Sequence, residues 1–168
     1  MKILIALFAA WLAVIPLAGA ATPGEVEIGS VLREANMQGL SGPNRKLSDY
    51  RGKPLIINVW ASWCGPCRQE MASLERLSRR YAKQFTVIGI STDDYPDRAK
   101  GFLQVAATSF PHYIDSQLFL ENMLGANRIP LTVLVDADGR VLAKYYGAKE
   151  WDSRPAVDAI GKIFRLSL

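Results

Sequence analysis

The only two cysteines of this 168-residue chain, Cys64 and Cys67, are separated by Gly65 and Pro66. Two thiols at this spacing can form a structural disulfide, half of a metal site, or a dithiol that opens and closes during a redox reaction. A disulfide that encloses two residues stabilises a fold very little, because the stabilisation grows with the length of the closed loop. The structural bridge is therefore the weakest of the three interpretations.

A metal site would need ligands beyond the two thiols. His112 is the only histidine, and it would not complete a zinc site with two cysteines unless carboxylates joined them. Two thiolates suit Cu(I), so a copper-delivery protein stays an alternative, weakened by the absence of a Met-rich or His-rich cluster. A lone histidine on a short strand is usually structural. We predict no metal and no cofactor.

The residues around the cysteines predict a strand followed by a helix. Residues 55–60 are mostly apolar and β-branched, which is typical of a strand buried on both faces. The 3–4-residue spacing of apolar side chains predicts a helix over 65–83. Cys64 would then lie at the helix N-terminus, where free N–H groups stabilise a thiolate. We expect Cys64 to be the exposed attacking thiol and Cys67 to be the shielded resolving thiol.

The rest of the chain alternates between strand and helix patterns, which predicts an α/β fold. An Asp-Gly pair at 138–139 is a strong hairpin turn signal. The predicted elements are a hairpin from 35–37 and 45–47, a strand at 85–91, a helix at 97–107, an extended piece at 110–115, a helix at 117–124, a hairpin from 131–135 and 140–146, and a helix at 152–164.

The first twenty residues predict a secretory signal peptide. Lys2 precedes an apolar stretch over 3–15, and Ala18-Gly19-Ala20 is a small-residue cleavage site. An uncleaved anchor is the alternative, because the uncharged run continues to Gly24. Either interpretation places the protein outside the cytoplasm. Residues 21–29 form a leader, and residues 30–168 form one domain.

The formal charge of +4 has mixed signs along the chain and no basic cluster interleaved with aromatic residues. This pattern does not predict nucleic-acid binding.

The stretch Trp-Ala-Ser-Trp-Cys-Gly-Pro-Cys at 60–67, after an apolar strand, resembles the thioredoxin superfamily. Residues 47–53 resemble its extracytoplasmic branch, the thiol-disulfide reductases of the thioredoxin-like protein A type, related to those that serve cytochrome c maturation. The resemblance implies a thioredoxin-like α/β fold with a central mixed β-sheet flanked by helices, an N-terminal hairpin and a central insertion, which residues 94–128 fit.

The same resemblance implies where the protein acts and on what. It implies a bacterial periplasmic protein whose partners are a disulfide-bonded protein substrate, for which an oxidised apocytochrome c is one candidate, and a membrane thiol electron donor. Gly65 and Pro66 form the dipeptide of thioredoxin, a reductant of about −270 mV, which favours a reductase over an oxidase. A peroxiredoxin-like peroxidase shares the fold, but it needs its cysteine in a different local setting.

The resemblance also implies site residues beyond the thiol pair. A cis-proline faces the cysteines in this superfamily, and Ile129-Pro130 matches its position. Backbone beside such a proline pairs with an extended substrate, so both residues are predicted substrate contacts, although a strand-start proline is the plainer alternative. Gly65, Pro66 and Trp63 are predicted to contact partners, whereas Trp60 is predicted to lie in the core.

Two positions depart from thioredoxins proper, which pair a buried aspartate before the active site with a lysine on the next strand. Asn58 and Gly89 stand at these positions, and neither can move a proton. Glu70 matches a carboxylate of the cytochrome-maturation relatives and, three residues after Cys67, can lie beside it on the helix. We predict that Glu70 accepts the Cys67 proton; a solvated surface glutamate is the alternative.

Overall fold

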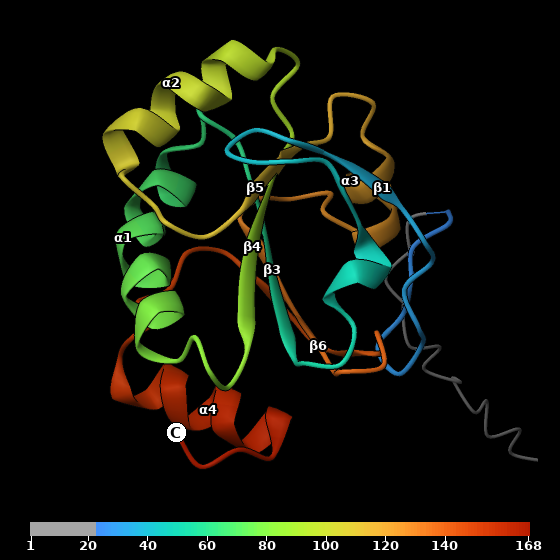
Figure 1. Ribbon diagram of the computed structural model, residues 1–168, viewed down its shortest axis with the longest axis vertical. Coiled ribbons are helices and arrows are strands. Elements are labelled where there is room, and N and C mark those ends of the chain that lie inside the picture. Colours follow the sequence, from blue (N-terminus) through green and yellow to red (C-terminus); the bar gives the residue numbers. More distant parts are fainter. Residues whose placement is uncertain (1–22) are drawn as a thin grey trace, which may run out of the picture.

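One mixed sheet contains all seven strands of the part of the chain that the structure describes, residues 23–168. Figure 1 shows this computed structural model. The strands are β1 (Asn36–Gly39), β2 (Arg45–Lys46), β3 (Leu55–Trp60), β4 (Thr86–Ser91), β5 (His112–Ile114), β6 (Leu131–Val135) and β7 (Val141–Tyr146). Their spatial order is β2-β1-β5-β4-β3-β6-β7, with β3 parallel to β4 and antiparallel to β6. The predicted signal peptide or anchor over 1–20 lies outside the described residues.

Two hydrophobic clusters cover the two faces of the sheet. Successive side chains of a strand point to opposite faces, so Ile56 and Trp60 of β3 belong to one cluster, and Ile57 and Val59 belong to the other. The helices are α1 (Gly65–Arg80), α2 (Pro96–Ala106), α3 (Phe119–Leu124), α4 (Arg154–Phe164) and the short 3-10 helix η1 (Leu47–Tyr50). Helices α1, α2 and α4 pack on the Trp60 face, and α3 and η1 pack on the opposite face (Figure 1).

The strand and the helix that carry the cysteines form where the sequence predicts them. Strand β3 has the predicted bounds, and all six of its residues are buried. Helix α1 begins at Gly65 as predicted but ends at Arg80, three residues before the predicted end. The reason is local: Tyr81 leaves the helical region with φ −113° and ψ 24°, and the N–H groups of Gln84 and Phe85 turn back to its carbonyl.

The predicted insertion, residues 94–128, contains α2, β5 and α3. Strand β5 pairs in parallel with β4 and antiparallel with β1, so the insertion joins the N-terminal hairpin to the central sheet. The predicted hairpin near the C-terminus is β6–β7, and Gly139 takes the positive φ of 87° that its turn requires. Helix α4 follows, with Pro155 in its first turn.

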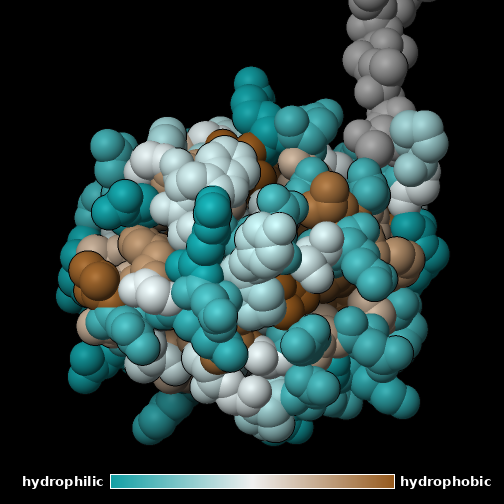
Figure 2. All heavy atoms as spheres, turned by 90° about the horizontal axis from the view of Figure 1, so that it is seen from above, coloured by the Kyte–Doolittle hydropathy of each residue, from teal (hydrophilic) through white to brown (hydrophobic). Residues whose placement is uncertain are grey.

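The end of the molecule that carries α2 and the start of α1 is viewed in Figure 2. Apolar residues on this face are dispersed among polar ones and form no continuous patch. Within residues 23–168, no helix combines the length and apolarity needed to cross a membrane.

Candidate active site

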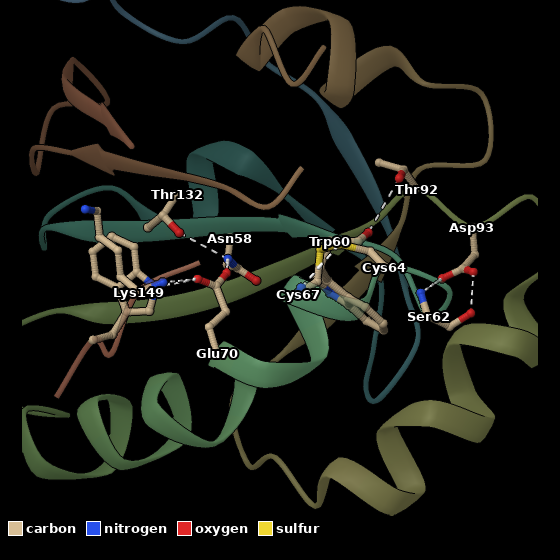
Figure 3. The surroundings of a disulfide bond; sticks show 11 residues. Asn58, Trp60, Ser62, Cys64, Cys67, Glu70, Thr92, Asp93, Thr132 and Lys149 are labelled. Carbon is tan, nitrogen blue, oxygen red and sulfur yellow. Dashed lines mark hydrogen bonds between the residues drawn. A yellow bond between two sulfur atoms is a disulfide. The ribbon is translucent and has the colours of Figure 1, made fainter. Parts of the chain in front are cut away.

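Cys64 and Cys67 are joined by a disulfide at the N-terminal end of α1 (Figure 3). Cys64 is the N-cap residue of the helix, and its sulfur accepts a hydrogen bond from the backbone N–H of Cys67 at 3.2 Å. A sulfur held against a free helix N–H carries a negative charge more easily. This position therefore favours Cys64 as the thiolate when the disulfide is reduced.

The disulfide form exposes less of Cys64 than the sequence predicts. Cys64 is 6% exposed and Cys67 is 0% exposed. The expected open position of Cys64 is therefore wrong for this form, because its sulfur turns onto the helix N-terminus and the residue belongs to the same buried cluster as Trp60 and Ala61. Cys64 is nevertheless the more exposed of the two thiol residues.

An exposed rim surrounds Cys64. Trp63 is 67% exposed, and Gly65 and Pro66 are also exposed. Pro66 lies in the first helical turn, where its missing N–H costs no intrahelical hydrogen bond. Trp60, four residues before Cys64, is fully buried as predicted. The four residues around the disulfide therefore divide into one core tryptophan and three surface positions.

A buried carboxylate fixes the loop that leads into the disulfide. Asp93 accepts hydrogen bonds from the backbone N–H of Ser62 at 2.9 Å and from its hydroxyl at 2.6 Å (Figure 3). The hydroxyl of Ser91 also donates to Asp93, at 2.8 Å. Asp93 is 1% exposed. Sequence reasoning missed this residue; its position two residues after the buried strand β4, whose last residue pairs with the end of β3, is the feature that could have pointed to it.

Glu70 lies inside the protein, behind the disulfide. Its carboxylate accepts hydrogen bonds from Asn58 Nδ2 at 2.7 Å, from Trp151 Nε1 at 2.9 Å and from the backbone N–H of Lys149 at 3.1 Å. Burial raises the pKa of Glu70 above its usual value, and the three N–H groups act in the opposite direction. The glutamate is 2% exposed, unlike a solvated surface residue. Its role as a proton acceptor stays a prediction.

Asn58 and Gly89 lie side by side in the paired strands β3 and β4. Asn58 is fully buried, and its Nδ2 also donates to Thr132 Oγ1 at 3.1 Å. A Cβ on Gly89 would lie 2.2 Å from His112 Nδ1 and 2.9 Å from Trp60 Nε1, so the position has no room for a side chain. Neither residue can transfer a proton in the way that a carboxylate or an amine would.

The peptide bond between Ile129 and Pro130 is cis, and it immediately precedes β6. Ile129 is half-buried and packs against both hydrophobic clusters, whereas Pro130 is buried. The carbonyl of Pro130 accepts a hydrogen bond from the N–H of Gly147 at 2.9 Å. The predicted role of these two residues as substrate contacts remains a prediction.

His112 is a core residue on β5. It is 1% exposed, lies edge-on to Trp60 with ring centroids 5.5 Å apart, and shares a 2.9 Å hydrogen bond with Thr108 through Nε2. Burial lowers the pKa of His112 to about 3, so its ring is neutral at physiological pH. Among residues 23–168, no group of three or more histidine, cysteine, aspartate or glutamate side chains is arranged to hold a metal ion.

Comparison with protein families and curated proteins gives consistent matches. The Redoxin family model matches residues 29–160. The thiol-disulfide oxidoreductase ResA of Geobacillus thermodenitrificans is 32% identical over 117 residues, which cover 69% of this chain and 67% of that protein. The thioredoxin-like protein YneN of Bacillus subtilis is 27% identical over 139 residues, covering 79% of this chain and 81% of that protein.

Solved structures show the same architecture. A putative thiol:disulfide interchange protein DsbE from Chlorobium tepidum matches with a TM-score of 0.76 and 27% identity, covering 83% of this chain and 99% of that one. A putative protein disulfide isomerase from Bacteroides thetaiotaomicron matches with a TM-score of 0.70 and 26% identity, covering 83% and 91%. These matches confirm the predicted thioredoxin-like fold.

Proposed function

Because the chain belongs to the Redoxin family and is a thiol-disulfide oxidoreductase of the thioredoxin-like type, we propose that it reduces disulfides of client proteins outside the cytoplasm. The observation that carries this proposal is the position of the two sulfurs, with Cys64 on the N–H of Cys67 at the start of α1 and Cys67 enclosed behind it. The Gly65-Pro66 dipeptide between them, shared with thioredoxin at about −270 mV, supports the reducing direction.

The reaction has two exchange steps. The Cys64 thiolate attacks one sulfur of the client disulfide, a mixed disulfide forms, and the first client sulfur leaves as a thiolate. The Cys67 thiol then loses its proton, and the resulting thiolate attacks Cys64. The Cys64–Cys67 disulfide forms and the second client sulfur leaves, so two electrons pass from this protein to the client.

Glu70 is the proposed acceptor of the Cys67 proton. It lies three residues after Cys67, on the buried side of α1. A buried carboxyl whose pKa is raised by desolvation is a stronger base than an exposed one. After it has accepted the proton, it releases that proton at a pH closer to neutral than an exposed carboxyl would. Replacing Glu70 by Gln removes the acceptor with little change of shape, so the Cys67 pKa and the rate of the second step should both change; unaltered values would exclude this role.

Client recognition uses the exposed rim and the cis-proline segment. The flat, exposed ring of Trp63 offers apolar contact beside Cys64, and Gly65 and Pro66 leave space for a client chain. The backbone beside Ile129 and Pro130 pairs with an extended client segment. An oxidised apocytochrome c is the proposed client.

The predicted signal sequence over residues 1–20 supports a periplasmic location. A reductase in an oxidising compartment must itself be reduced again, and a membrane thiol donor is the proposed source of electrons.

Trapping tests the assignment. With Cys67→Ala, the second step is blocked, so mixed disulfides on Cys64 should accumulate in cells and identify the client. The matched control, Cys64→Ala with Cys67→Ala, should trap nothing. The reduction potential tests the direction independently: a value well above about −200 mV would replace the reductase assignment with an oxidase.

A further inference from the structure

One hydrogen-bonding atom of the Asn58 side chain is not used by the contacts described above. Asn58 is 0% exposed, and its Nδ2 donates to both Glu70 and Thr132. Its Oδ1 has no hydrogen-bond partner among residues 23–168. Buried amide oxygens are almost always paired, because an unpaired oxygen keeps the full cost of its lost hydration. A donor for this oxygen is therefore to be expected in another state of the protein.

The register of β3 shows which donor can reach it. Ile56 and Trp60, two residues before and after Asn58, belong to the hydrophobic cluster under α1, so Asn58 points to the same face. Cys67 and Glu70 are three residues apart on the buried side of α1, and Nδ2 binds Glu70. In Figure 3 the amide oxygen points away from Glu70, toward the side where Cys67 lies.

We propose that Asn58 Oδ1 accepts a hydrogen bond from the Cys67 thiol when the disulfide is reduced. In the disulfide form the Cys67 sulfur carries no proton, which accounts for the unpaired oxygen. A thiol is a weak donor, but a fully buried amide oxygen and a fully buried thiol have no water to compete for either of them. Asn58 is then a positioning residue for the resolving cysteine.

This arrangement separates the roles of the two thiols. A hydrogen bond to the neutral form of a group disfavours its ionised form, so Asn58 keeps Cys67 protonated while Cys64 alone is a thiolate. The inference rests on the proposed order of attack, with Cys64 first and Cys67 second. When Cys67 reacts, its proton passes to Glu70, and the amide itself gains and loses none.

Few other charges contribute to this environment. On α1 the titratable neighbours are Cys64 and Glu70, while β3 and β6 contribute the uncharged side chains of Asn58 and Thr132. The loop before α4 contributes the backbone N–H of Lys149, the positive charge of the Lys149 side chain, which lowers the pKa of Glu70, and the indole of Trp151.

The test measures the ionisation of Cys67 alone, in the Cys64→Ser protein, from its thiolate absorbance as a function of pH. Asn58→Leu keeps the shape of the side chain and removes the acceptor. A lost hydrogen bond of typical strength should increase the ionisation constant of Cys67 about tenfold, a fall in pKa of about one unit. In the protein with both cysteines, Asn58→Leu removes a bond that only the reduced form makes, so the same factor makes the reduction potential about 30 mV more negative.

Two further variants distinguish a direct effect of Asn58 on the Cys67 pKa from an effect that acts through Glu70. Thr132→Val removes the other Asn58 contact but leaves Oδ1 in place, so the Cys67 pKa should not move. In a Glu70→Ala background, Asn58→Leu should still produce the tenfold change. If that change vanishes without Glu70, or is absent in Asn58→Leu itself, Cys67 does not donate to Asn58 and the proposal is overturned.

A measurement that needs no Asn58 variant covers the case in which Asn58→Leu does not fold. The infrared S–H stretch of Cys67 in the Cys64→Ser protein should lie below the free-thiol frequency; a free-thiol frequency overturns the proposal. None of these experiments uses a client, so a wrong client or a wrong direction of electron flow would leave their outcome unchanged. A high potential in the wild-type protein would instead contradict the proposed function.

Discussion

Trp151 donates its indole N–H to Glu70 at 2.9 Å although 81 residues separate the two in the chain. The backbone N–H of Lys149 reaches the same carboxylate oxygen. The loop before α4 therefore supplies two of the three hydrogen bonds to a carboxylate that α1 carries. Burial raises the pKa of Glu70, and these N–H groups limit the rise, so the basicity of Glu70 depends on a distant part of the sequence.

Trp151→Phe should raise the pKa of Glu70 further, because one donor to its charged form is lost while burial remains. In the proposed mechanism only the carboxylate form of Glu70 accepts the Cys67 proton, so the rate of the second exchange step should reach half its maximum at a higher pH. The measurement is that rate as a function of pH. Tyr145→Phe is the matched control: its ring lies 5.8 Å from that of Trp151, without a hydrogen bond to Glu70, and should leave the midpoint unchanged.

Asp93→Asn should loosen the loop before Cys64. An asparagine oxygen can still accept one hydrogen bond, but its NH₂ group would face the N–H of Ser62, which loses its partner. An unpaired buried polar group costs about 1–3 kcal/mol of the unfolding free energy. Urea unfolding should show this loss, and the reaction of Cys64 with a small disulfide should slow. Asp94→Asn, at the exposed neighbouring residue, should change neither the stability nor the reaction rate. Equal effects of the two substitutions would mean that the loss comes from the removed negative charge and not from the hydrogen bonds of Asp93.

Strong local patterns made much of the fold predictable. The apolar run of β3 and the Asp-Gly turn of β6–β7 specify their structures within a few residues, and the structure confirms both. The early end of α1 at Arg80 was not predictable, because helical residues continue beyond it and only the turn at Tyr81 stops the helix.

The site was predictable only where a motif is contiguous. The thiol pair lies in one such motif, whereas Asp93, which accepts the hydrogen bond from the Ser62 N–H, lies 31 residues away from it in the chain. The contacts of Glu70 with Asn58 and Trp151 likewise depend on how β3, α1 and the last loop pack together. The spacing of Glu70 after Cys67 is visible in the sequence, but the burial of its carboxylate is a property of tertiary structure alone.

Trp63→Ala should weaken exchange with protein clients and leave the fold intact. The residue is 67% exposed, so its loss should change the unfolding free energy by no more than about 0.5 kcal/mol. In the proposed mode of recognition its ring contacts a protein client but not a small thiol. We therefore expect a lower rate with a disulfide-bonded protein and an unchanged rate with dithiothreitol. A parallel loss in both assays would show that Trp63 acts on Cys64 itself.

Gly89→Ala should destabilise the protein by about 1–3 kcal/mol, the usual cost of overpacking a core. The new Cβ would lie 2.2 Å from His112 Nδ1, on a ring that Trp60 and Phe110 hold in place. Gly101→Ala is the opposite case, because its Cβ meets nothing within 4 Å and the residue lies within α2. That change should stabilise the protein by roughly 0.5–1 kcal/mol. Thermal unfolding of the two variants should therefore shift in opposite directions.

The neutral, buried ring of His112 should make the protein less stable in acid. In the unfolded chain this imidazole takes up a proton below a pH of about 6.5, whereas in the folded protein burial lowers its pKa to about 3. Between these values the unfolded state binds more protons, so the stabilisation is fully present above pH 6.5 and is lost as the pH falls toward 3. The slope should approach about 1.4 kcal/mol per pH unit.

His112→Phe isolates this contribution, because it keeps an aromatic ring against Trp60 and removes the ionisation. Glu70 and Asp115, whose pKa values are raised by burial and which therefore act in the opposite direction, are present in both proteins and cancel in the difference. The unfolding free energy of the wild type minus that of the variant, from urea titrations between about pH 4 and pH 7, should rise with pH across the range set by the two His112 pKa values. A difference independent of pH would mean that His112 accepts a proton in the folded protein as readily as in the unfolded chain.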